Sequence, residues 1–161
     1  MNDAGSVVLS ELVSTATIKL NLTGATRDAV LDELVGQIPS IAGQPQMRQT
    51  LLRALQEREQ LHSTGIGEGI ALPHARNALV GLVDRAVIVF GRHVQGVPYE
   101  AIDGVPVRLF FLLIAPTVTQ HLAILARISR LLRNPKLRQN LLMADRPETV
   151  VSLIREAEAK M

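Results

Sequence analysis

The strongest constraint on the fold is an eight-residue segment, VRLFFLLI, from Val107 to Ile114, in which Arg108 is the only polar residue. The run is short and rich in β-branched and aromatic residues, so it predicts a strand that is buried on both faces. A strand of this kind is typical of a sheet covered by helices on either side. The longest uninterrupted apolar stretch, Leu109 to Ala115, is far shorter than the ~20 residues of a membrane-spanning helix. The run therefore belongs inside a folded domain.

Strand-like and helical segments alternate along the rest of the chain. Period-two alternation predicts a strand from Thr15 to Leu22, and short apolar runs predict strands at Ile70–Leu72 and Ala86–Phe90. Apolar residues at helical spacing predict the following helices: one capped by Thr26 and ending before Pro39, one at about residues 46–61, and others after Pro116, from Pro135 and from Pro147. We therefore predict an α/β fold with helices flanking both faces of a sheet.

The length of 161 residues suits one domain, because domains cluster near ~100–150 residues. We expect a single domain over residues 1–161, with residues 1–8 forming a flexible N-terminus. The N-terminus carries Asp3 and no basic segment before an apolar one, which is unlike a secretory signal. There is no cysteine for disulfides or thiolate chemistry. We expect a cytoplasmic protein that does not insert into a membrane.

Charge and aromatic content argue against a nucleic-acid partner. The chain has 17 Lys and Arg against 15 Asp and Glu, a net charge of +2, which is too small for a phosphate-backbone footprint. Aromatic residues make up only 2%, so the stacking platforms of single-strand and RNA-binding modules are missing. We expect no nucleic-acid binding.

The segment with the most chemical information is TGIGEGIALPH, from Thr64 to His74. Its alternating glycines would let backbone N–H groups approach an anion, and Pro73 restricts the turn that presents His74. The glycines fit neither the phosphate loop of nucleotide hydrolases nor the dinucleotide fingerprint. The alternative reading is a tight glycine turn over Ser63–Gly69 that leads into a strand, with an ordinary surface histidine behind it.

The other three histidines differ in their predicted surroundings. His121 falls in the first turn of a helix on its apolar side, where the helix dipole favours a neutral imidazole that can bond a phosphate or a second imidazole. The alternative is a core-edge histidine bonded to a backbone carbonyl. His62 at a helix C-terminus is predicted to be structural, and His93 to be solvated in a Gly91–Gly96 turn. No histidine pair has metal-ligand spacing, so no metal site is expected.

The helix after Pro116 is predicted to be amphipathic. We expect three arginines to form a solvated face or to dock an acidic partner: Arg127, Arg130 and Arg133. We expect the opposite, buried stripe to contain Leu122, Leu125, Ile128 and Leu132.

These motifs together resemble the enzyme IIA domain of the fructose/mannitol class in the bacterial phosphoenolpyruvate-dependent sugar phosphotransferase system. The signature consists of Glu59, Ile66-Gly67 and Ile70-Ala71-Leu72-Pro73-His74-Ala75. The likeness extends through residues 101–104, 110–116, 121–122, 141–142 and 147–154. The likeness covers nearly the whole chain, and the chain most resembles the free-standing nitrogen-regulatory branch of the family.

The resemblance implies a mixed β-sheet flanked by helices and a function as a phosphoryl carrier. His74 would accept a phosphoryl group from a histidine-containing phosphocarrier protein, His121 would stabilise the phosphorylated histidine, and Arg58 looks like the active-site arginine. Because the donor already carries a reactive N–P bond, we expect no ATP, metal or other cofactor to be needed. Positive potential for the phosphoryl oxygens is expected from Arg58, His121, the loop amides of residues 64–69 and, as a hydroxyl donor, Thr64. Arg58 has a simpler alternative as well, which is pairing with Glu57 or Glu59 on a solvated face.

Two branches of the family and two other classes of protein stay open. The domain would pass its phosphoryl group to a IIB component in sugar uptake, or use it as a signal to a transporter or sensor kinase. A chain this short has no room for attached IIB or membrane IIC domains, which favours the regulatory branch. The alternatives are an interaction module of the same fold that binds such a partner without phosphoryl transfer, and a histidine-metal hydrolase.

Overall fold

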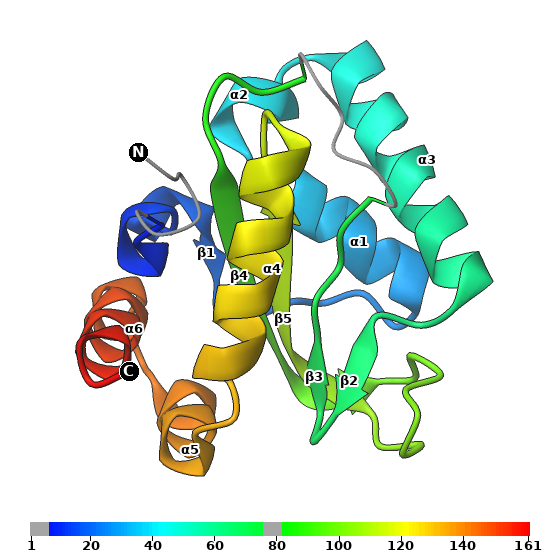
Figure 1. Cartoon of the computed structure of the whole chain (residues 1–161). Coiled ribbons are helices and arrows are strands. Elements are labelled where there is room, and N and C mark those ends of the chain that lie inside the picture. Colours follow the sequence, from blue (N-terminus) through cyan, green and yellow to red (C-terminus); the bar gives the residue numbers. More distant parts are fainter. Residues whose placement is uncertain (1–6, 76–81) are drawn as a thin grey trace.

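A mixed sheet of five strands, in the order β1-β4-β5-β3-β2, forms the centre of the computed structural model, which describes residues 7–75 and 82–161 (Figure 1). The strands are β1 (Ile18–Lys19), β2 (Gly65–Gly67), β3 (Ile70–Ala71), β4 (Val87–Val97) and β5 (Val107–Ile114). β1 runs parallel to β4 and β3 parallel to β5, whereas the β4–β5 and β2–β3 pairs are antiparallel. The mixed sheet expected from the resemblance is confirmed.

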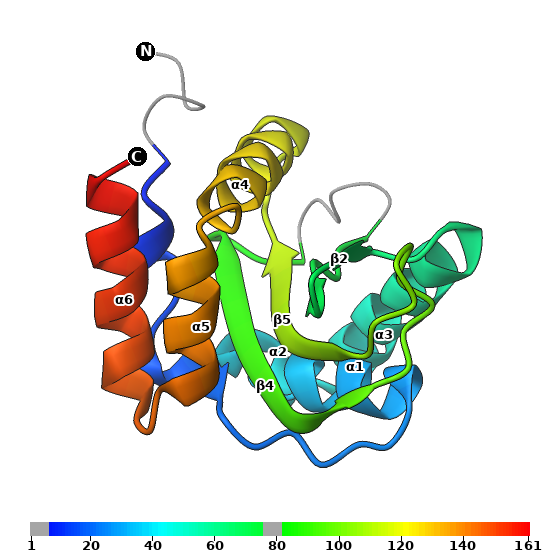
Figure 2. The same cartoon turned by 90° about the horizontal axis from the view of Figure 1, so that it is seen from below.

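Helices cover both faces of this sheet, as predicted (Figures 1 and 2). One layer contains α1 (Arg27–Val35), α2 (Pro39–Ala42) and α3 (Pro45–Leu61), and the other contains α4 (Val118–Leu131), α5 (Pro135–Met143) and α6 (Pro147–Ala159). Thr26 caps α1 by accepting a hydrogen bond from the Ala29 amide at 3.2 Å. None of the described helices is long and apolar enough to cross a membrane.

β5 separates two hydrophobic cores, which confirms the prediction that it is buried on both faces. Alternate side chains point to opposite sides of a strand. Leu109, Phe111 and Leu113 join the core beneath α4, α5 and α6. Phe110, Leu112 and Ile114 join the core beneath α1 and α3. The central strand is therefore packed on both faces, and it provides a fixed support for β3 and β4, which pair with it.

The N-terminal strand prediction was only partly correct. Residues Thr15–Thr17 form a 3-10 turn, and β1 is limited to Ile18–Lys19. A capping box explains the turn, because Ser14 and Thr17 exchange side-chain and backbone hydrogen bonds. These local bonds compete with sheet pairing. Most of the expected flexible N-terminus, residues 1–6, lies outside the described residues.

Two predictions for the helix after Pro116 need correction. Leu122, placed in the buried stripe, is 58% exposed, because the inward face is occupied by residues such as Ile124 and Ile128. Arg127, placed on the solvated face, donates from Nε to Glu158 of α6 at 2.9 Å. Arg127 therefore forms an ion pair between α4 and α6, whereas Arg130 and Arg133 are exposed as predicted.

Candidate active site

Two of the four histidines, His74 and His121, lie together at the end of β3 and the start of α4. Their ring centroids are 5.5 Å apart and their planes are inclined by 57°. The fold brings them together because β3 pairs with β5, and β5 leads directly into α4. The sequence prediction of a histidine pair is met by this geometry.

Backbone hydrogen bonds hold the two residues that precede His74. The Leu72 amide donates to the Thr64 carbonyl at 3.0 Å, and the Leu113 amide donates to the Pro73 carbonyl at 3.1 Å. His74 Nδ1 lies 2.6 Å from the Leu72 carbonyl oxygen. Because a carbonyl only accepts hydrogen bonds, Nδ1 must carry the ring proton in the neutral imidazole. The lone pair of that imidazole is therefore on Nε2.

The electrostatic surroundings keep both rings neutral. Burial lowers the pKa of His74 below 6.5, the charge of Arg58 lowers it further, and the bond to Leu72 only partly opposes these effects. Burial also lowers the pKa of His121, with a further contribution from the positive charge that His74 carries when it is protonated. Each imidazole therefore favours its uncharged form near neutral pH, and an uncharged ring is what a nitrogen nucleophile requires.

The first turn of α4 places His121 against the site. The Thr117 hydroxyl accepts from the Gln120 amide at 3.2 Å and so fixes where the helix begins. His121 is only 5% exposed, which agrees with the prediction that it faces inward. Val118 and Leu122 flank it on the same helix but are 53% and 58% exposed. A buried imidazole is thus bordered by an apolar surface.

Arg58 reaches the site from the last turn of α3. Its guanidinium donates from Nη1 to the carbonyl of His62, which follows the helix, and its charge acts on His74. The simpler prediction, in which Arg58 pairs with Glu57 or Glu59, is wrong, because no ion pair among the described residues joins Arg58 to either carboxylate. Glu59 is 4% exposed and bonds other residues.

The glycine segment is a hairpin and not an open anion-binding loop. Gly65–Gly67 forms β2, which pairs with β3, so the predicted Ser63–Gly69 loop is partly strand. Its amides have partners: Thr64 donates to Glu59, Gly65 to the Ser63 hydroxyl and Glu68 to Asp103. The expectation that these amides would surround a phosphate is therefore not met at these three positions. Positive φ at Gly67 and Gly69, +94° and +76°, instead shapes the tight turn.

A buried carboxylate network beneath the hairpin was missed by sequence reasoning. Glu59 accepts from the Thr64 amide at 2.8 Å, from the Thr64 hydroxyl, and from the Tyr99 hydroxyl at 2.8 Å. The Thr64 hydroxyl thus donates to Glu59, and a phosphate could take it as donor only if that bond were broken. One signal was available, since Glu59 continues the four-residue spacing of the buried Leu51 and Leu55.

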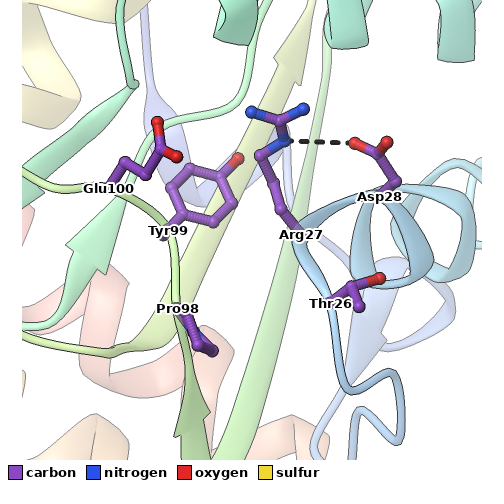
Figure 3. A pocket seen from close by; sticks show the side chains of 6 residues that line it. All are labelled: Thr26, Arg27, Asp28, Pro98, Tyr99 and Glu100. Atoms are coloured by element: carbon purple, nitrogen blue, oxygen red, sulfur yellow. Dashed lines mark hydrogen bonds and ion pairs between the residues drawn. The ribbon is translucent and has the colours of Figure 1, made fainter.

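Tyr99 joins this network to a surface pocket. Its hydroxyl end points toward Arg27 of α1 across a pocket of about 370 Å³ lined by Thr26, Arg27, Asp28, Pro98, Tyr99 and Glu100 (Figure 3). Burial and the charge of Glu59 raise the pKa of Tyr99 well above 10, so the phenol keeps its proton and remains a donor. Arg27 itself bonds Asp28 at 3.1 Å.

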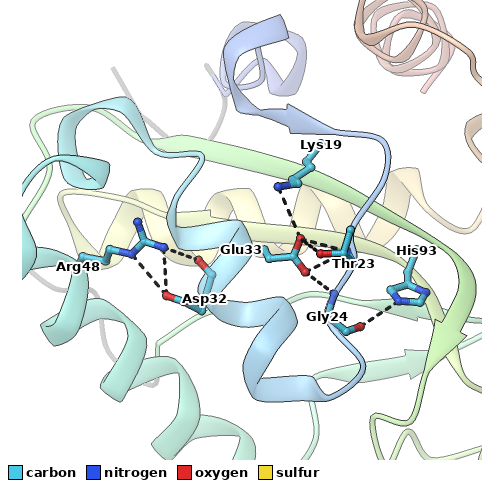
Figure 4. A network of polar contacts seen from close by, with 7 residues as sticks. All are labelled: Lys19, Thr23, Gly24, Asp32, Glu33, Arg48 and His93. Atoms are coloured by element: carbon cyan, nitrogen blue, oxygen red, sulfur yellow. Dashed lines mark hydrogen bonds and ion pairs between the residues drawn. The ribbon is translucent and has the colours of Figure 1, made fainter.

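The remaining histidines lie away from the pair. His62 is exposed after α3, in agreement with its predicted place at the helix end. The prediction that His93 is solvated in a turn is wrong, because β4 continues through it to Val97 and leaves it 9% exposed. Its Nε2 donates to the Gly24 carbonyl at 2.9 Å (Figure 4). Its Nδ1 accepts from the Gly96 amide at 3.0 Å. Glu33 holds the same segment by accepting from the amides of Thr23 and Gly24.

A metal-binding cluster is not formed by the part of the chain that the structure describes. No three His, Asp or Glu side chains come together there in a way that could hold an ion. Positive charge at the histidine pair comes from Arg58.

The fold and the pair of histidines are those expected of an enzyme IIA domain, and comparison with known proteins shows the family. The family model described as "Phosphoenolpyruvate-dependent sugar phosphotransferase system, EIIA 2" matches residues 11–157. The chain belongs to this family of phosphoryl-transfer proteins.

Relatives with two kinds of names are similar to the chain. A fructose-specific EIIABC component of Bacillus subtilis is 39% identical over 150 residues, which is 92% of this chain but only 23% of that protein. A nitrogen regulatory protein of Bradyrhizobium diazoefficiens is 30% identical over 148 residues, 91% of this chain and 94% of that one. The crystal structure of the nitrogen regulatory protein IIA-Ntr from Neisseria meningitidis matches with a TM-score of 0.80 at 26% identity, covering 92% of this chain and 99% of that one.

Proposed function

We propose that His74 accepts a phosphoryl group on Nε2 from a phosphorylated histidine of a histidine-containing phosphocarrier protein. The observation that carries this proposal is the 2.6 Å contact between His74 Nδ1 and the Leu72 carbonyl. It places the ring proton on Nδ1 and leaves the Nε2 lone pair for attack on phosphorus. The lowered pKa of His74 supports the proposal, because only a neutral imidazole has this lone pair.

The transfer exchanges one phosphorus–nitrogen bond for another. As the Nε2–phosphorus bond forms, the bond between phosphorus and the donor nitrogen breaks, and the donor nitrogen keeps the electron pair. Nδ1 keeps its proton and its bond to Leu72, which stabilises the positive charge that the ring gains on phosphorylation. The two bonds are alike in energy, so catalysis requires in-line positioning and stabilisation of charge on the phosphoryl oxygens.

Arg58 and His121 would provide that stabilisation. Arg58 already acts on His74 through its charge, and a guanidinium is well suited to paired phosphoryl oxygens. His121, 5.5 Å from His74 between ring centroids, can donate from a ring nitrogen to the same group. After transfer, the added negative charge would favour a protonated His121 and strengthen this bond.

The exposed apolar residues beside the site would contact the donor. Val118 and Leu122 lie on the turn of α4 that carries the buried His121, and both are more than half exposed. Apolar contacts of this kind form the core of protein interfaces, and charged residues surround them. A phosphocarrier seated on this turn would bring its phosphohistidine to His74.

The second half of the proposal concerns where the phosphoryl group goes. It passes to a IIB component, or its presence regulates a transporter or sensor kinase. The names of the relatives support each outcome, since one is an EIIABC component and another a nitrogen regulatory protein. A group carrying about −2 charge beside an apolar surface is sufficient to repel or recruit a partner.

Phosphoryl transfer from phosphoenolpyruvate through purified enzyme I and phosphocarrier tests the proposal. The modified residue is mapped under alkaline conditions, and we expect an acid-labile phosphate on His74 that the His74→Ala variant lacks. A chain that stays unmodified, with a phosphocarrier shown to be active on another acceptor, would instead be an interaction module of the same fold. Subsequent incubation with IIB proteins separates onward transfer from regulation.

A further inference from the structure

We propose that the buried carboxylate of Glu59 is a positioning residue that holds His74 in its Nδ1-protonated form through Thr64 and Leu72. The proposal deepens the proposed function and rests on it, because the form with a free Nε2 is the one that would accept the phosphoryl group. Glu59 itself does not contact the reacting atoms. Its action is through the backbone that carries His74.

Three donors converge on Glu59 from two separate segments. The amide and hydroxyl of Thr64 donate from the start of the hairpin, and the Tyr99 hydroxyl donates from the segment that follows β4. A carboxylate accepts hydrogen bonds only, so its oxygens match this set of donors. At 4% exposure water cannot replace them, and loss of the carboxylate would leave buried donors without partners. Glu59 therefore fixes the position of the start of the hairpin relative to the end of α3.

The position of Thr64 is transmitted to the imidazole in two further hydrogen bonds. The Thr64 carbonyl accepts from the Leu72 amide at 3.0 Å, next to the Gly65–Ala71 pair of β2 and β3. The carbonyl of the same Leu72 accepts from His74 Nδ1 at 2.6 Å. A shift of Thr64 would thus turn or displace the carbonyl that selects the ring proton. Without that acceptor, the proton would distribute between the two ring nitrogens.

Glu59 also fixes Arg58 relative to the hairpin. The two residues are adjacent in the last turn of α3, and they point in different directions, Glu59 into the core and Arg58 toward His62. The bonds from Glu59 to Thr64 and Tyr99 set the rotation of this turn. One carboxylate therefore aligns the nucleophile and the cation next to it.

The chain offers a closely matched control in Glu158. This residue is 8% exposed and accepts from the Leu9 amide at 2.6 Å, the Ser10 amide at 3.2 Å and Arg127 Nε at 2.9 Å. It lies on α6, on the far side of the molecule from the hairpin (Figure 1). Loss of Glu158 should destabilise the fold as loss of Glu59 does, but its hydrogen-bond partners, Leu9, Ser10 and Arg127, are not among the residues that hold the His74 ring proton.

Nitrogen-15 NMR of the histidine rings in the unphosphorylated chain tests the inference. His74 signals are assigned by their absence in His74→Gln. We expect the wild-type ring to be almost wholly protonated on Nδ1 and Glu59→Ala to give a mixture of the two forms. Glu59→Gln should restore the wild-type pattern, because its amide oxygen accepts from the Thr64 amide and the two hydroxyls can accept from its NH₂ group. Glu158→Ala should leave the His74 signals unchanged.

Phosphorylation kinetics provide the second readout. We expect Glu59→Ala to slow modification of His74 about a hundredfold at saturating phosphocarrier, since a displacement near 1 Å has an effect of that size. The phosphocarrier concentration at half-maximal rate should not change, because Glu59 is buried away from the docking surface. The inference is overturned if folded Glu59→Ala keeps the wild-type ring pattern, or if Glu158→Ala disturbs it equally. The NMR measurement needs no phosphorylation, so it tests the role of Glu59 even if the chain accepts no phosphoryl group.

Discussion

His93 is buried and His74 is partly buried, yet only His74 is built to react. His93 uses both ring nitrogens, with Nε2 donating to Gly24 and Nδ1 accepting from Gly96. His74 uses Nδ1 on the Leu72 carbonyl, and no described residue bonds its Nε2. A neutral imidazole has one donor and one acceptor nitrogen, so His93 is satisfied and His74 keeps its acceptor available. Reactivity here depends on the unused nitrogen more than on burial.

The surroundings of the two rings reinforce this difference. His93 lies in the interior of β4, beside a segment that Glu33 and Lys19 also hold in place (Figure 4). His74 follows a strand of two residues, next to Arg58 and a second imidazole. A fully paired histidine stabilises a junction between distant segments. A half-paired histidine near positive charge can take up an anionic group.

The largest expected effect comes from replacing each of these two histidines in turn by alanine. His74→Ala should abolish phosphoryl transfer, because it removes the proposed acceptor. His93→Ala should leave the transfer rate unchanged but lower the free energy of unfolding by about 1–3 kcal/mol, because Gly24 and Gly96 lose buried partners. Both variants are measured by transfer from phosphorylated phosphocarrier and by urea denaturation. Normal phosphorylation of His74→Ala would show that another residue is the acceptor.

A second prediction concerns the charge beside His74. Arg58→Gln should slow phosphorylation about tenfold to a hundredfold, since hydrogen bonds to charged groups contribute ~1.5–3 kcal/mol. The same change should raise the pKa of His74, because the charge of Arg58 lowers it. NMR titration of the ring measures that pKa directly. Exposed Arg53 on the same helix offers the control, and Arg53→Gln should alter neither quantity.

His121→Ala should have a smaller effect on the same reaction. Loss of one neutral donor has a cost near 1.4 kcal/mol, or about tenfold in rate. We expect slower modification of His74 and earlier hydrolysis of its phosphate, followed by quenched time courses and alkaline mapping. Replacement of exposed His62 by alanine is the matched control. A normal rate and a normal phosphate lifetime would assign His121 to the core alone.

Much of the fold could be predicted because its signals are local and periodic. The apolar run of β5 and the helical spacing of α3 and α4 need no knowledge of distant residues. The length of β4 could not be predicted in this way. Gly91 and Gly96 suggest a turn, whereas in the fold β4 pairs with β5 across them, with an irregularity between Arg92 and Val97. Pairing across the sheet overrode a local signal.

The candidate site shows the same contrast between features with a local sequence signal and features that depend on distant residues. Its histidines and arginine stand in a recognisable motif, and the fold brings His74 and His121 together as expected. Three of the hairpin amides expected to face an anion have other partners, and two of these partners, Glu59 and Asp103, come from separate segments. The role of Glu59 depends on Tyr99, forty residues further along the chain. No local pattern encodes that contact.

The smallest predicted effect is on stability between pH 7.5 and 5.5. His74 and His121 have pKa values below the ordinary 6.5 in the folded chain, so the unfolded chain binds more protons as the pH falls through 6.5. Their contribution to stability is therefore complete above that pH and decreases toward the lower folded pKa values. We expect the melting temperature to fall by about 1–4 °C across this range, and the double variant His74→Gln/His121→Gln to lose most of that fall. An unchanged pH dependence in the double variant would mean that these two rings are no harder to protonate when folded, which would contradict the neutral nucleophile on which the comparison with His93 rests.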